Sequence, residues 1–324
     1  MASPAEISSL VGSTSILIYC GCGLYGILCA QAFECMNNFP DDPKLLKTAS
    51  AAVMILETIH TSLTIISLYI YTVSAAADPL SILGISWNTG AVCVVEIFIV
   101  LIVQGYFIRR VWLLSDGRRT GLVLVIILSA LVIARCGFEL ATAIYIWSPS
   151  TNTWISFRKT RASYLSYSGW LAFATVGDVG IAAVLSYYLW KKRSAVRSTN
   201  NIIRRTMAFT LNSGAITAAV ALGGLIAFFM SNSLANTGIL VIASKLYANS
   251  FFGMLNARHF ARRDTVRIVQ DSEFSFPTTD DGSQNTAEIV PVRPRYLNAL
   301  ILTEFSLEGD KSLPVKISKV GDSE

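Results

Sequence analysis

Seven long apolar stretches run through the chain, and each is long enough to cross the hydrocarbon core of a bilayer as a helix. Helices are expected because an isolated strand would leave its backbone polar groups unpaired in lipid. Only 15% of the residues are charged and 53% are hydrophobic, which is atypical of a soluble globule. The predicted spans are Val11–Phe33, Leu46–Thr72, Trp87–Phe107, Gly121–Trp147, Tyr164–Trp190, Thr206–Met230 and Ile239–Leu255. We therefore predict an all-α, polytopic membrane protein built as a seven-transmembrane-helix bundle.

The basic residues between the spans fall on alternate connections. The first, third and fifth connections and the segment after the last span carry Lys and Arg, whereas the N-terminal segment and the second and sixth connections carry none. Cytosolic loops are enriched in these residues, so the pattern places the N-terminus outside and the C-terminus in the cytosol. The fourth connection is the exception, with Arg158, Lys159 and Arg161.

The third and fifth connections together form a predicted basic face on the cytosolic side. Acidic lipid headgroups or a cytosolic protein partner would bind such a face. The basic excess belongs to the membrane part and has no soluble patch with interleaved aromatics, so we expect no nucleic acid partner. The residues of this basic face are Arg109, Arg110, Lys191, Lys192, Arg193, Arg204 and Arg205.

The composition changes near residue 261, where Asp, Glu, Ser, Thr and Pro increase and the long apolar runs stop. A segment with few apolar residues and much charge cannot bury a core. The predicted organisation is therefore a transmembrane bundle over residues 1–260, followed by a disordered acidic cytosolic tail over 261–324.

Ionisable and amide side chains occur inside the predicted spans, where they are costly and are usually turned inward or paired. Glu57 and His60 are three residues apart, and Arg135 and Glu139 are four apart, so each pair shares a helix face. The simplest interpretation of Arg135 and Glu139 is an intrahelical ion pair, and Lys245 is expected to pair with a nearby carboxylate. The helical rise places these polar residues in the centre and outer half of the bundle. They are expected to form either an outward-facing pocket or polar contacts that hold the helices together. Its members are Glu57, His60, Glu96, Gln104, Arg135, Glu139, Asp178, Asn212, Lys245 and Asn249.

Patterns of known chemistry are absent from the sequence. The chain has no GxSxG, HExxH, P-loop or CxxC pattern, and its two histidines lie far apart, so we expect no enzyme, no metal site and no cofactor. Retinal proteins attach their chromophore to a lysine in the seventh helix, with a carboxylate counter-ion in the third. Lys245 and Glu96 fit that outline, but no aromatic cage is evident in the sixth span.

Several short motifs occur in order along the chain: Leu56–His60, Val103–Trp112, Gly177–Asp178, Leu211–Thr217 and Ser244–Ser250. On these motifs the chain resembles, over about residues 15–260, a group of basidiomycete fungal seven-helix membrane proteins that carry a C-terminal domain of unknown function. The resemblance implies that this domain lies near residues 170–260. Glu57 stands where similar proteins more often have Asp, and Ser213 stands where Thr is common. The resemblance implies the architecture rather than an activity.

Two functional hypotheses follow. The first is a receptor or sensor in the plasma membrane, with a small-molecule ligand in an outward-facing polar pocket. The alternative is a proton- or cation-coupled transporter of small solutes, in which Glu57, His60, Glu96 and Asp178 would carry the ion. A structural role in the membrane is a third reading. The fourth connection has no Cys, so coupling to a G protein would rest on fold analogy alone.

Overall fold

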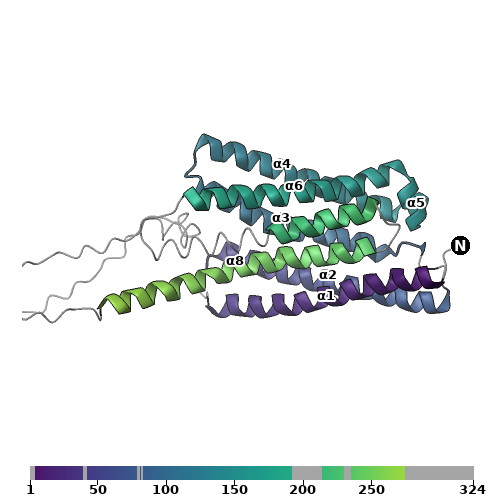
Figure 1. Cartoon of the computed structure of the whole chain (residues 1–324), viewed down its shortest axis with the longest axis horizontal. Helices are drawn as coiled ribbons and strands as arrows, with labels where there is room; N and C mark the ends of the chain where they lie inside the picture. The colour runs from purple at the N-terminus through teal and green to yellow at the C-terminus, as the bar shows by residue number, and fades with distance from the viewer. Residues whose placement is uncertain are drawn as a thin grey trace, which may run out of the picture.

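The computed structural model of the chain describes residues 4–38, 42–78, 81, 83–191, 214–229 and 235–273. The described residues are almost entirely helical, and their only strand-like feature is one isolated bridge between Gly84 and Thr153. Long helices run side by side in one bundle (Figure 1). They are α1 (Pro4–Asn38), α2 (Lys44–Ala77), α3 (Trp87–Leu114), α4 (Arg119–Trp147), α6 (Arg161–Lys191) and α8 (Ala235–Glu273). The expected all-α architecture is confirmed for this part of the chain.

Six of the described helices are long and apolar enough to cross a membrane. Their outward faces carry large apolar side chains such as Ile126 and Ile133 on α4, which are 59% and 67% exposed. Water would solvate such a surface poorly, whereas lipid suits it. A further apolar helix covers Gly214–Phe229, within the expected span Thr206–Met230, whose other residues lie outside the described ones. The chain is therefore an integral membrane protein, and the count of seven spans stays a prediction.

Helix α8 is longer than the sequence predicted. It continues to Glu273, whereas the expected span ended at Leu255 and the disordered tail was expected from residue 261. Residues 257–273 contain neither Gly nor Pro, so the sequence holds nothing that stops the helix. Figure 1 shows this end of α8 extending past the other helices. The rest of the predicted tail, residues 274–324, lies outside the described residues.

The connection between α4 and α6 is an ordered cap over one end of the bundle. It contains a 3-10 turn, Pro149–Thr151, and the short helix α5, Trp154–Lys159. Thr153 and Ser156 form a reciprocal capping box at the start of α5. The backbone amide of Ile85 donates to the carbonyl of Asn152 at 2.8 Å, which ties the cap to the α2–α3 connection.

Arg158 explains part of the unusual charge of this connection. Its guanidinium donates to the carbonyl of Phe228 and lies 4.8 Å from the centre of the Phe228 ring. Phe228 lies in the last described turn of the helix Gly214–Phe229. Arg158 therefore ties this connection to that helix, so its place in the fourth connection has a local structural reason.

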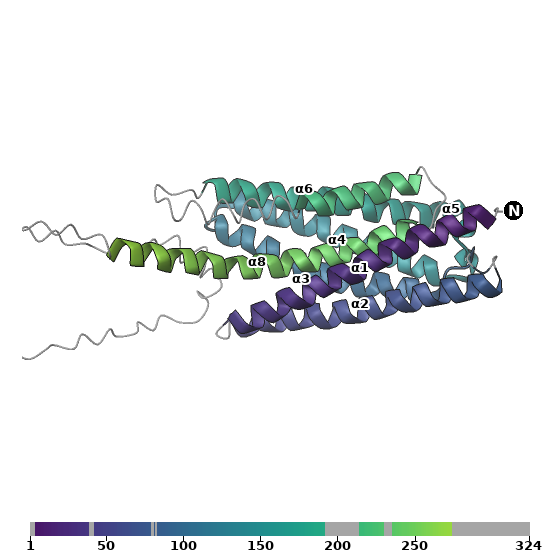
Figure 2. The same cartoon turned by 60° about the horizontal axis from the view of Figure 1, so that its bottom comes forward.

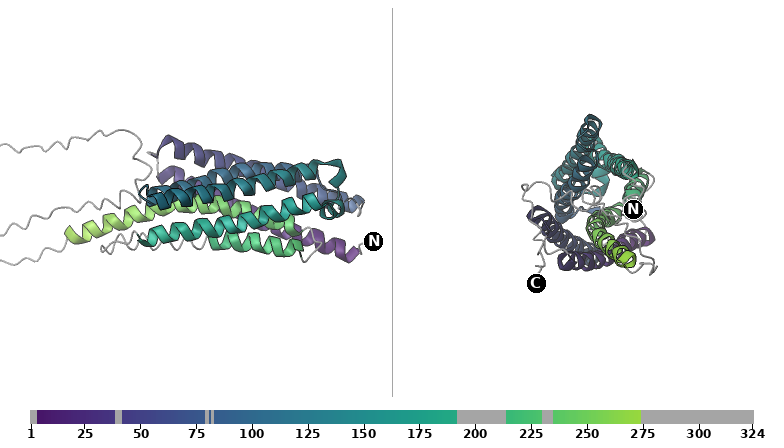
Figure 3. Two further views of the ribbon diagram at one scale, coloured as in Figure 1. Left: turned by 90° about the horizontal axis from the view of Figure 1, so that it is seen from above. Right: turned by 90° about the vertical axis from the view of Figure 1, so that its left-hand side faces the viewer.

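Helix α8 packs along α1, as Figures 2 and 3 show. The Asn249 amide donates to the carbonyl of Leu24 at 3.1 Å, and the Asn256 amide donates to the carbonyl of Gln31 at 2.8 Å. Both the donors and the acceptors are seven residues apart, which is the repeat of two parallel helices in register. The first and last described helices are therefore aligned by a repeated hydrogen bond.

Glycines allow this close approach. A Cβ atom on Gly238 would lie 2.6 Å from the Cβ of Leu17, and one on Gly21 would lie 2.9 Å from Val241 Cγ1. Small residues at such positions let membrane helices pack closely where no hydrophobic effect drives them together. This tight contact sets the position of the polar residues that α8 carries.

Candidate functional site

The bundle buries eight of the ten polar residues that the sequence singled out. The other two differ. Asn249 faces α1 and takes no part in a central cluster, and Asn212 lies outside the described residues. The buried eight are Glu57, His60, Glu96, Gln104, Arg135, Glu139, Asp178 and Lys245, each at most 5% exposed. They form two adjoining groups, one on either side of α8.

The first group joins α2 to α8. Lys245 Nζ contacts a carboxylate oxygen of Glu57 and lies 3.1 Å from Nδ1 of His60. The hydroxyl of Ser244 donates to the other Glu57 oxygen at 3.0 Å. The ammonium also lies 5.7 Å from the ring centre of Tyr25 on α1. The expected pairing of Lys245 with a carboxylate is confirmed, and Glu57 and His60 share one buried face as their spacing predicted.

The second group joins α3, α4, α6 and α8 through Arg135. Its Nη2 donates to Glu96 at 3.2 Å, and its Nη1 donates to the hydroxyl of Tyr247 at 2.7 Å. The Tyr247 hydroxyl in turn donates to Asp178 at 2.6 Å, and the Gln104 amide donates to the other Asp178 oxygen at 2.8 Å. Each of the four long helices in this half therefore contributes at least one polar side chain to a continuous network.

The predicted intrahelical pair of Arg135 and Glu139 is present as a long ion pair, but it is not the closest contact of Arg135. Arg135 Nε and the nearer Glu139 oxygen are 4.0 Å apart, which is beyond hydrogen-bond distance. The guanidinium is drawn instead toward Glu96 and Tyr247 on neighbouring helices. A spacing of four residues makes two side chains neighbours, but it does not decide which of several buried acceptors the guanidinium chooses.

Tyr247 is the residue that sequence reasoning missed. Its ring lies 4.7 Å from the Arg135 guanidinium carbon, and its hydroxyl bridges Arg135 and Asp178. Lys245 and Tyr247 are two residues apart, hence about 200° around a helix, so they face opposite sides of α8. That spacing was the available signal, because two polar groups on opposite faces indicate a helix surrounded by protein.

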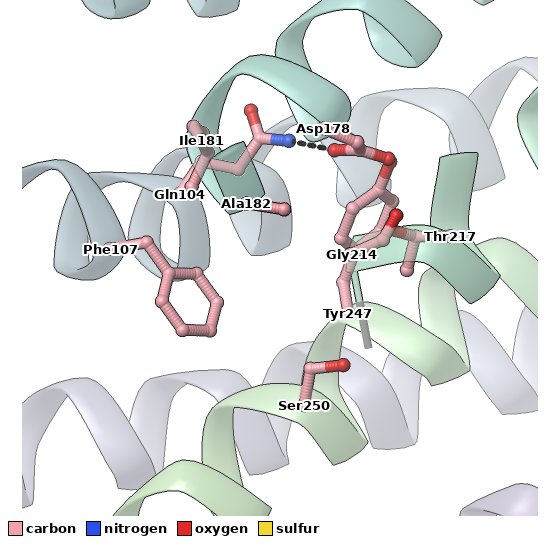
Figure 4. Close-up of a pocket in the computed structure, with 9 residues that line it drawn as sticks. All are labelled: Gln104, Phe107, Asp178, Ile181, Ala182, Gly214, Thr217, Tyr247 and Ser250. Atoms are coloured by element: carbon pink, nitrogen blue, oxygen red, sulfur yellow. Dashed lines mark hydrogen bonds between the residues drawn. The ribbon is translucent and has the colours of Figure 1, made fainter. Parts of the chain in front are cut away.

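A small cavity adjoins the second group. It has a volume of about 30 Å³, room for about one or two water molecules. Figure 4 shows Gln104, Asp178 and Tyr247 converging at one side of it. Its lining residues are Gln104, Phe107, Asp178, Ile181, Ala182, Gly214, Thr217, Tyr247 and Ser250.

The cavity lies in the half of the bundle opposite to the one predicted for a pocket. Phe107, Ile181 and Ser250 follow Glu96, Asp178 and Tyr247 on their helices, toward the ends of α3, α6 and α8 that lie away from the N-terminus. At the N-terminal end, the ordered α5 cap and buried aromatic side chains such as Phe157 and Trp170 fill the interior. The cavity described therefore does not lie at the N-terminal end, where the pocket was predicted, and the side of the membrane that each end faces stays a prediction.

The predicted basic face is only partly within the described residues. Arg109 and Arg110 are half-buried near the end of α3, and Lys191 is exposed at the end of α6. Lys192, Arg193, Arg204 and Arg205 lie outside the described residues. The face as a whole stays a prediction.

The described residues contain no group of three or more His, Cys, Asp or Glu side chains that could hold a metal ion. The retinal outline is also altered, since the carboxylate that contacts Lys245 comes from Glu57 on α2 and not from Glu96 on α3. The side chains that the two groups bring together can form ion pairs and hydrogen bonds and can exchange protons.

Comparison with known proteins adds one finding. Residues 174–260 match a family of unknown function, DUF6534. No curated protein and no solved structure matches the chain. The matched segment includes Asp178, the helix Gly214–Phe229 and the part of α8 that carries Lys245 and Tyr247. It agrees with the expected domain of unknown function near residues 170–260, and together with the apolar helices it identifies a membrane protein that contains a segment similar to DUF6534.

Proposed function

We propose that the chain is a receptor-like or sensor-like membrane protein with seven spans, and that α8 is the element whose position changes with the stimulus. The observation that supports this is the pair of polar contacts on opposite faces of α8. Lys245 holds α2 on one side, and Tyr247 holds Arg135 and Asp178 on the other.

Such contacts suit a helix that switches between two positions. They stabilise the bundle when both partners are present, and a buried charge without its partner destabilises it. In a low-dielectric interior a fully paired charge is tolerated, whereas an unpaired one costs several kcal/mol. A stimulus that breaks the contact of α8 with α2 or with Arg135 would therefore favour a second, distinct position of α8 over a gradual shift. The extended end of α8 and the basic face would carry that change to a cytosolic protein or to anionic lipid.

The proposal includes the orientation, with the N-terminus outside and the C-terminus in the cytosol of a cell whose plasma membrane holds the protein. We expect an epitope tag ahead of Met1 to be stained in intact cells, because the charge pattern keeps the basic connections inside. A tag after Glu324 should be stained only after permeabilisation. Immunofluorescence of both tagged forms measures this, with a known cytosolic tag as the permeability control. The reverse pattern would place the basic face outside and end the proposal of a cytosolic partner.

Proton- or cation-coupled transport is the second candidate function. The observation in its favour is the water-sized cavity against Asp178, which would give that carboxyl a hydrated neighbour. Carboxylates next to internal water are the usual elements of a proton pathway in a membrane protein.

The two candidate functions predict different proton fluxes. We expect vesicles that contain the purified full-length protein to show no more proton uptake than protein-free vesicles, because a sensor needs no open pathway. A pH gradient and a dye trapped inside the vesicles measure the uptake. A pH-dependent flux that disappears in Glu96→Gln and survives in the exposed variant Glu34→Gln would instead establish transport.

A further inference from the structure

Glu139 differs from the other buried carboxyl groups of the bundle. It is completely buried, yet no donor among the described residues reaches hydrogen-bond distance of either of its oxygens. Glu57 receives Ser244 and Lys245, Asp178 receives Tyr247 and Gln104, and Glu96 receives Arg135, as described above. A buried carboxylate normally accepts several hydrogen bonds, so the charged form of Glu139 lacks hydrogen-bond support.

Arg135 does not supply that support. Two of its guanidinium nitrogens are committed to Glu96 and Tyr247, and its Nε lies 4.0 Å from Glu139 without a hydrogen bond. Those two nitrogens are held by α3 and α8 while Nε stays without a hydrogen-bond partner. The guanidinium of Arg135 is therefore the one cation shared by Glu96 and Glu139, and the Tyr247 hydroxyl links it to the carboxylate of Asp178.

The buried charges do not balance when every carboxyl group is ionised. The described core holds four carboxyl groups but only two cationic side chains, Arg135 and Lys245. The third buried basic group, His60, places its Nδ1 3.1 Å from the Lys245 ammonium and therefore accepts from it as a neutral ring. In an interior of low dielectric constant, an uncompensated carboxylate is unfavourable by several kcal/mol. A bound cation would reduce this excess of two negative charges, and the described residues include no group of three or more His, Cys, Asp or Glu side chains that could hold a metal ion. A proton needs only one oxygen.

We propose that Glu139 is a proton-binding site: its carboxyl group carries a proton while α8 is in the arrangement described, and loss of that proton makes Glu139 a competitor for Arg135. This goes beyond the proposed function and does not depend on whether the bundle senses or transports.

Release of the proton has a defined structural consequence. The new carboxylate would attract the guanidinium from 4.0 Å away, and the bonds from Arg135 to Glu96 and Tyr247 would weaken. Tyr247 also donates to Asp178, so the contacts of α8 with α4 and with α6 would both weaken. The titratable and charged groups around this position are Cys93 and Glu96 on α3, Arg135 and Cys136 on α4, Tyr167 and Asp178 on α6, Lys245 and Tyr247 on α8, and Glu57 and His60 on α2.

Infrared spectroscopy of the full-length protein in lipid nanodiscs tests the proposal directly. At neutral pH we expect a carbonyl stretching band of a protonated carboxylic acid, which shifts on exchange into D₂O. Glu139→Gln should remove intensity from this band, whereas Glu34→Gln, which neutralises an exposed carboxyl group of α1, should leave it unchanged. Absence of the band, or the same band intensity in Glu139→Gln as in the wild type, would overturn the proposal.

Thermal unfolding of the same samples gives a second readout. Gln resembles a protonated Glu in shape and charge, so Glu139→Gln should keep the wild-type melting temperature. Glu57→Gln should lower it by several degrees, because it leaves the Lys245 ammonium without its carboxylate. If Glu139→Gln lost as much stability as Glu57→Gln, or did not fold, Glu139 would be acting as a charged partner and the proposal would be wrong.

Discussion

Replacing Lys245 by Met should destabilise the folded protein by about 3–5 kcal/mol, since it leaves the carboxylate of Glu57 buried without its cation. Both side chains are completely buried, so water cannot compensate for the lost contact. Thermal unfolding of the purified variant in nanodiscs measures this loss of stability. The exposed Lys159→Met in α5 is the matched control and should change the stability by less than about 0.5 kcal/mol.

A double variant separates the ion pair from simple packing loss. Lys245→Met combined with Glu57→Gln removes both charges, and it should recover a large part of the stability that Lys245→Met alone loses. Ser244 would still have an oxygen to bond at position 57. A double variant that is no more stable than Lys245→Met would mean that the methylene chain of Lys245, and not its charge, holds α2 to α8.

Replacing Arg135 by Met should have an effect of similar size, about 3–5 kcal/mol, because the guanidinium joins α4 to both α3 and α8. Its loss leaves Glu96 without a donor and the Tyr247 hydroxyl with one bond fewer. Arg135→Lys keeps the charge but not the planar fork, so it should recover only part of the loss. The melting temperature and the yield of monodisperse protein report the effect.

The control for this experiment is Arg119→Met at the exposed start of α4. It removes the same charge from the same helix without touching the network. Equal stability of Arg135→Met and Arg119→Met would contradict the view that the Arg135 network holds the bundle together.

The arrangement of these residues shows which features the sequence determines alone. Apolar length was enough to predict most spans, and helical spacing was enough to place Glu57 and His60 on one buried face. Both features depend on a single helix and its solvent, which a sequence contains. The helix Gly214–Phe229 lies inside the expected span Thr206–Met230, whose other residues lie outside the described ones.

The remaining features depend on which helices become neighbours. Arg135 has Glu139 one turn away in its own helix, yet its bonds go to residues 39 and 112 positions distant. Tyr247 was overlooked because an aromatic ring in an apolar run resembles packing until an acceptor is found for its hydroxyl. The ordered connection with Arg158 and the continuation of α8 to Glu273 likewise follow from tertiary contacts or from missing stop signals, and not from hydropathy.

The link between Glu57 and Lys245 has a consequence for biosynthesis. The two residues are 188 positions apart, so the ribosome releases α2 into the bilayer long before α8 exists. Until then the nascent chain must shelter an acidic side chain by another means, such as a chaperone or a headgroup at the membrane edge. Truncated messages that end before codon 245 would therefore yield products with an unmatched intramembrane acid, a feature that membrane quality control can recognise and degrade.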